Sequence, residues 1–187
     1  MTIFEIEELE VAHVTDEQAT AIGKLALSFN FLESCVEEGI SFIISPQDPS
    51  AIGILTRRLG FDAKVSRLEA IVKHFQHSLS LPQKWEPPAD QVHKWAAESI
   101  GQLSVLLKRL RDAAEFRNRL VHAVVTPNPN QPHGTLTSRA GIEVTADPTT
   151  ISTEAKRIGA LGIAVITFAQ QFRGSVRNFR QLRHGGS

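Results

Sequence analysis

The chain has 187 residues, enough for one domain to bury a hydrophobic core without disulfides or metals. Its 20 basic and 20 acidic residues cancel, so no global positive field marks a nucleic-acid-binding protein, and the single cysteine, Cys35, excludes an intrachain disulfide framework. The amino terminus is acidic, unlike a signal peptide. The longest apolar run, 158–169, is shorter than the roughly 20 residues of a membrane span. We therefore expect a soluble, cytoplasmic protein with no membrane association.

The first part of the chain predicts an arm followed by a long helix. Residues 3–12 alternate loosely and are typical of a short strand or arm. Thr15 and Gln18 form a capping-box pattern, which predicts a helix from residue 15 to about 44. Glu33 occupies the middle of its apolar stripe, whose other members are Ile22, Ala26, Phe29, Val36, Ile40 and Ile43.

Three further helices are predicted before residue 125. Asp48 and Pro49 suit the start of a helix over 49–59, and Asp62 suits the start of another that ends near residue 79. A proline-rich turn follows at 81–88. The next helix, about 89–124, has an apolar stripe interrupted by Arg117; its other members are Leu103, Leu107, Leu110, Ala114, Val121 and Val124.

The part of the chain after residue 125 is predicted to form a small hairpin and a last helix. Residues 135–139 and 142–145 flank Ala140-Gly141, which is typical of a β-hairpin. A final helix is expected from about residue 152, with a frayed basic tail over 174–187. The expected fold is therefore mainly α, a single domain over 1–187 in which antiparallel helices form a bundle, with a β-hairpin insert at about 127–150 before the last helix.

Two charges on apolar stripes point to an internal pair. Glu33 and Arg117 have opposite signs, and each occupies a position where its helix predicts an apolar residue. A buried charge is costly unless it is paired, so we expect the two side chains to lie near each other in the core. An ion pair that only fixes helix register is the structural alternative.

Arg117 also begins a segment that could carry chemistry. A guanidinium matches phosphate, and His122, five residues later, can move a proton near neutral pH. Asn118 shares a helix face with His122 and could orient its imidazole. Arg117 and His122 are about 140° apart around one helix, so we favour a twofold dimer that brings two copies of the segment together.

These groups suit RNA cleavage without a metal or cofactor. A histidine could deprotonate the 2′-hydroxyl, and arginine could stabilise the phosphorane that leads to a 2′,3′-cyclic phosphate. The chain has no carboxylates clustered with histidines at metal-ligand spacing. Three nearby cations, Lys108, Arg111 and Arg119, could line an RNA track or simply form a solvated face.

The segment RNRLVH resembles the Arg-x4-His motif of the HEPN superfamily (higher eukaryotes and prokaryotes nucleotide-binding), including an asparagine after the arginine. The stretch FNFLESCVEEGI, with an internal glutamate in the first long helix, is similar as well. The resemblance implies a helical homodimer with a composite cleft, acting as a metal-independent endoribonuclease in toxin–antitoxin, phage-defence or RNA-processing systems. It assigns catalysis to Arg117 and His122, with Asn118 and Glu33 supporting.

The same resemblance implies RNA as substrate and an antitoxin or a nucleotidyltransferase-like protein as partner. Some members have a tyrosine, modified by that partner, two residues after the histidine; here the position is Val124, and the chain has no tyrosine, which excludes that modification. Other members only bind. The alternatives are therefore a non-catalytic helical module that binds nucleotide, RNA or protein, and a purely structural dimerisation protein.

Overall fold

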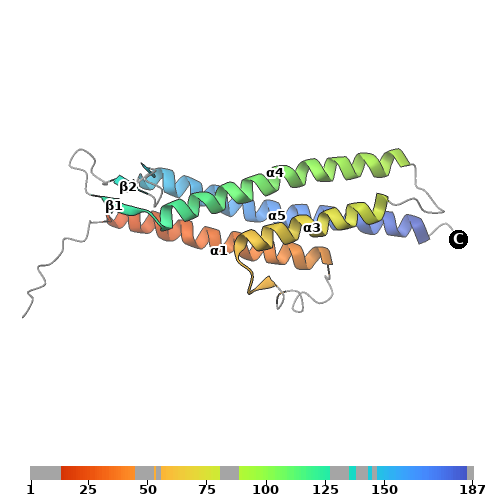
Figure 1. Ribbon diagram of the computed structural model, residues 1–187, viewed down its shortest axis with the longest axis horizontal. Helices are drawn as coiled ribbons and strands as arrows, with labels where there is room; N and C mark the ends of the chain where they lie inside the picture. The colour runs from red at the N-terminus through yellow and green to blue at the C-terminus, as the bar shows by residue number, and fades with distance from the viewer. Residues whose placement is uncertain are drawn as a thin grey trace, which may run out of the picture.

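Four long helices dominate the computed structural model, which describes residues 14–44, 53, 56–80, 89–126, 135–137, 143–144 and 147–184 (Figure 1). They are α1 (Asp16–Ile44), α3 (Phe61–Ser80), α4 (Ala89–Val121) and α5 (Pro148–His184). The expectation of a mainly α chain is confirmed. No helix in this described part is both long enough and apolar enough to cross a membrane.

The helix boundaries follow local capping chemistry. Thr15 and Gln18 form the predicted capping box, in which the Thr15 amide donates to Gln18 Oε1 at 3.0 Å and the Gln18 amide donates to Thr15 Oγ1 at 3.2 Å. At the start of α5, Asp147 accepts from the backbone amides of Thr149 (3.3 Å) and Thr150 (2.8 Å). The predicted start near residue 152 was therefore late, because Asp147 followed by Pro148 is itself an N-cap and first-turn signal.

Two helix ends also differ from prediction. Helix α4 ends at Val121, and Val124 belongs to a strand, because the β-branched run from Val124 to Thr126 favours extended backbone. Helix α5 continues to His184, so residues 174–184, expected as a frayed tail, are helical. The motif RNRLVH thus straddles the end of α4, with His122 just beyond it.

The directions of the helices correct the antiparallel expectation in one respect. Helix α4 runs antiparallel to both α3 and α5, but α1 and α5 run parallel (Figure 1). On α5, Gly159 lies near Ser28 and Gly162 lies near Cys35, whereas Val165 approaches Gly39 farther along α1. The chain reaches this arrangement because α3 runs in the same direction as α1, and α4 alone carries the chain back along the helices before α5 begins (Figure 1).

The core lies where α5 packs along α1, with α3 and α4 closing the other sides. Leu32 and Val36 on α1 and Ile158 and Val165 on α5 are completely buried. Cys35 is a free cysteine and is buried. A Cβ at Gly162 would lie 2.9 Å from Phe31 Cε1 and 3.1 Å from Cys35 Sγ, so glycine permits the close approach of α1 and α5.

Three short strands follow α4: β1 (Val124–Thr126), β2 (Thr135–Thr137) and β3 (Glu143–Val144). They form an antiparallel sheet in the order β1-β2-β3, with Val125 opposite Leu136 and Leu136 opposite Val144. The predicted turn at Ala140-Gly141 lies outside the described residues, so the complete hairpin insert stays a prediction. The same applies to the arm at 3–12, most of the helix at 49–59 and the turn at 81–88.

Candidate functional site

Arg117 lies near the carboxyl end of α4, half-buried against α1. Its guanidinium carbon is 5.4 Å from the centroid of the Phe29 ring, within the range of a cation–π contact. Its Nη1 donates a hydrogen bond of 3.0 Å to Asn118 Oδ1. The charge that interrupts the apolar stripe is thus accommodated by an aromatic face and an amide, and other N–H groups of the fork have no partner among the described residues.

The Phe29 ring is itself supported from α3. Its centroid lies 4.8 Å from that of Phe61, the first residue of α3, with the ring planes inclined by 50°. An aromatic side chain is held firmly when a second ring packs against it. Arg117 is therefore positioned by a short series of contacts that joins α4, α1 and the amino end of α3.

His122 follows the last residue of α4, in a turn. Its backbone amide donates to the Asn118 carbonyl oxygen at 3.1 Å, while its imidazole is exposed and has no hydrogen bond to another described residue. The prediction that the Asn118 amide orients the imidazole is wrong, because the Asn118 side chain contacts Arg117 instead. An exposed imidazole at this position remains free to meet a ligand.

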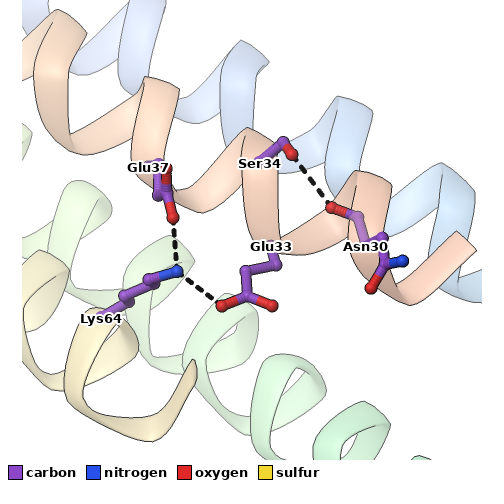
Figure 2. A network of polar contacts seen from close by, with 5 residues as sticks. All are labelled: Asn30, Glu33, Ser34, Glu37 and Lys64. Carbon is purple, nitrogen blue, oxygen red and sulfur yellow. Dashed lines mark hydrogen bonds and ion pairs between the residues drawn. The ribbon is translucent and has the colours of Figure 1, made fainter. Parts of the chain in front are cut away.

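Glu33 pairs with a residue that the sequence analysis did not single out. Lys64 Nζ donates to Glu33 Oε1 at 2.5 Å and also to Glu37, one turn farther along α1 (Figure 2). The lysine side chain is only 3% exposed, whereas the carboxylates are partly exposed. The predicted Glu33–Arg117 ion pair is therefore wrong, because α3 places Lys64 beside Glu33 and Arg117 lies one turn away, over Phe29.

This three-residue cluster joins the first turn of α3 to α1. Burial alone would lower the pKa of Lys64, but the hydrogen bonds and negative charges of Glu33 and Glu37 outweigh that effect and raise the pKa above the ordinary value. Lys64 therefore remains an ammonium ion at neutral pH. Glu33 has a structural partner, and nothing in its geometry directs it to Arg117 or His122.

The three predicted RNA-binding cations each have a carboxylate partner. Lys108 contacts Asp112 at 2.8 Å, Arg111 contacts Glu69 on α3 at 3.0 Å, and Arg119 pairs with Glu115. Hydrogen bonds and charges from Lys73 and Arg111 hold the pKa of Glu69 below its ordinary value, so this partner stays ionised. The pairs are exposed, so phosphate could displace the carboxylates, but the cations do not form a free basic track.

Of the two residues whose roles were not predicted from the sequence, Lys64 had a visible signal and Phe29 did not. Lys64 falls four residues before Leu68 on the inner face of its helix, so it interrupts an apolar stripe just as Glu33 does. Glu33 and Glu37, one turn apart, could have been matched to it. The role of Phe29 was hidden, because a phenylalanine on an apolar stripe predicts only core packing.

No group of three or more histidine, cysteine, aspartate or glutamate side chains within the described residues could hold a metal ion. His74 and His77 are exposed on α3. No protein-family model, curated protein or solved structure matches this chain. A functional proposal therefore has to be based on the chemistry of Arg117, Asn118 and His122 at the end of α4.

Proposed function

We propose that the protein is a metal-independent endoribonuclease of the HEPN type that cleaves single-stranded RNA. The observation that supports this most is that one end of α4 carries both a positioned guanidinium, Arg117, and an exposed imidazole, His122. The first group suits a phosphate and the second suits proton transfer. On the basis of the resemblance, we also propose that the protein acts in a toxin–antitoxin or phage-defence system. It would do so as a homodimer with an antitoxin-type protein partner.

The proposed step uses only the groups of the site and the RNA. His122 removes the proton of a 2′-hydroxyl, and the 2′-oxygen attacks the adjacent phosphorus while Arg117 binds the nonbridging oxygens. The bond from phosphorus to the 5′-oxygen breaks, and the leaving oxygen takes up the proton that His122 removed, so the imidazole is neutral again at the end of the step. The products are a 2′,3′-cyclic phosphate and a 5′-hydroxyl. Asn118 fixes the guanidinium through its side-chain oxygen.

The test is cleavage of single-stranded RNA in the presence of EDTA. We expect the wild type to cut, and Arg117→Ala and His122→Ala to reduce the rate by at least about a hundredfold. His77→Ala and Arg177→Ala are matched controls, since both residues are exposed and lie outside the site. RNA with 2′-deoxy nucleotides at the cut positions should resist cleavage. An inert wild type, or a His122→Ala variant with full activity, would refute the proposal.

A mixture of variants tests whether the cleft is composite. If each site takes Arg117 from one chain and His122 from another, mixing the two inactive variants should restore part of the activity. If every site is built within one chain, the mixture stays inactive although the wild type cuts.

A second candidate is a non-catalytic module that binds RNA, nucleotide or a protein at the same place. The carboxylate partners of Lys108, Arg111 and Arg119 favour it, because they leave little free positive charge for a long RNA strand. In that case the wild type would bind without cleaving, and Arg117→Ala would weaken the binding.

A further inference from the structure

Helices α4 and α5 form an open groove of about 650 Å³ on the surface. Its lining is largely apolar, and two of its aliphatic side chains are strongly exposed: Val105 on α4 is 55% exposed and Ile163 on α5 is 59% exposed. An apolar surface of this kind is typical of a contact with another polypeptide. The groove is separate from the Arg117–His122 site.

Two opposite charges beside the groove lie on one face of α4. Glu98 and Arg109 are 11 residues apart, about three helical turns, so they share one face with Val105 between them. Both side chains are exposed, and neither has an ion-pair partner among the described residues. The neighbouring cations Lys108 and Arg111 do have such partners. An acid and a base thus stand unpaired on one face of α4, about 10.5 Å before Val105 and about 6 Å after it along the helix.

We infer that this face binds a second copy of the same chain through a twofold axis that crosses α4 midway between Glu98 and Arg109, between Gln102 and Val105. The two α4 helices would then lie antiparallel, with Glu98 of each chain opposite Arg109 of the other. One symmetry operation makes both ion pairs, as expected for an isologous interface. On α5, no charged residue occurs between Arg157 and Arg173, so the two α5 faces meet without unpaired charges at their centre.

Other twofold arrangements leave the same charges unsatisfied. A copy whose α4 lies parallel on the first α4 brings Glu98 against Glu98 and Arg109 against Arg109. A copy whose α5 covers the first α4 offers Arg109 one acid, Glu154, which already pairs with Arg157, and the chain has no acidic residue after it. Like charges facing each other disfavour an association, so the antiparallel arrangement is the one that the sequence of charges selects.

This contact does not depend on ribonuclease activity and is distinct from a composite catalytic cleft. Val121, the last residue of α4, lies 16 residues beyond Val105, or about 24 Å along the helix. The antiparallel pairing therefore places the two Arg117–His122 sites at opposite ends of the dimer. A composite cleft would need a separate contact at the carboxyl end of α4.

Charge reversal tests the inference through the mass of the protein in solution. We expect a wild-type dimer by sedimentation equilibrium, and a Kd at least about tenfold weaker for Glu98→Arg and for Arg109→Glu, since each places like charges opposite each other twice. The double variant E98R/R109E should restore the Kd to within about threefold of wild type. Lys108→Glu, which reverses a cation next to Arg109, is the matched control and should leave the Kd unchanged.

Circular dichroism melts would show that each variant folds, which is expected because the substituted side chains are exposed. A wild-type protein that is monomeric at high micromolar concentration overturns the inference. So does a dimer that neither single reversal weakens, and so do singles that dissociate without rescue in the double variant. None of these results bears on RNA cleavage, which would be measured separately.

Discussion

At Lys64, a buried ammonium ion joins two helices through carboxylates that are one turn apart (Figure 2). We predict that the double variant E33Q/E37Q loses about 3–5 kcal/mol of unfolding free energy, because it leaves that ammonium ion buried without a charge partner. Urea denaturation at pH 7 measures the loss. Glu38→Gln is the control, since Glu38 is exposed on the same helix, and it should change stability by less than about 0.5 kcal/mol. Equal effects of the two changes would contradict the assignment.

Because of the same lysine, we predict that the folded protein loses stability in alkali. Its pKa in the folded protein is raised above the ordinary 10.5, so its contribution is fully present below that value and is lost as pH rises through the folded pKa. The stability advantage of wild type over Lys64→Met should therefore shrink as pH rises above about 10.5. Urea titrations at pH 9, 10 and 11 would show this, and the chain has no tyrosine that would ionise in the same range. A constant difference would contradict the prediction.

Among the elements, the contact between α1 and α5 is the least tolerant of added volume. Gly162→Val should cost about 1–3 kcal/mol, because its Cβ would lie 3.1 Å from the buried Cys35 sulfur and closer still to the Phe31 ring. In contrast, Gly23→Ala on α1 should stabilise by about 0.5–1 kcal/mol, because a Cβ there meets no atom within 4 Å and alanine favours a helix. Thermal unfolding of both variants measures the contrast, and a harmless Gly162→Val would refute the packing argument.

Element positions were largely predictable, because capping and periodicity are local. The Thr15–Gln18 box and the stripe through Phe29, Val36 and Ile40 define α1 without any tertiary information. Partners were not predictable in the same way. Glu33 and Arg117 each carry a charge on an apolar stripe, and each charge needs a partner. An apolar stripe does not show which helices face each other, and the structure places Lys64, not Arg117, beside Glu33. The parallel course of α1 and α5 is likewise a property of the whole chain and not of either helix.

For the molecule as a whole, stability should be uneven along the helices. Amides in α1 from Leu25 to Ile40 and in α5 from Ile158 to Val176 should exchange slowest with solvent, because these stretches bury most of their inner faces in the core. Amides at 94–98 of α4, where Lys94, Ala97 and Glu98 are exposed, should exchange at least about a hundredfold faster. Hydrogen–deuterium exchange read by mass spectrometry checks the order. Equal protection across α4 and α5 would contradict it.

The parallel packing of α1 on α5 has a consequence for synthesis on the ribosome. Arg173 Nη1 donates to the Phe42 carbonyl at 3.0 Å across 131 residues of chain, so a completed α1 has to wait for its partner to be translated. At about 5–20 residues per second, that wait is roughly 6–26 s. Throughout this interval the part of the apolar side of α1 that packs on α5 stays uncovered. Chaperones that bind exposed apolar segments would meet this chain early, and release would coincide with the emergence of α5.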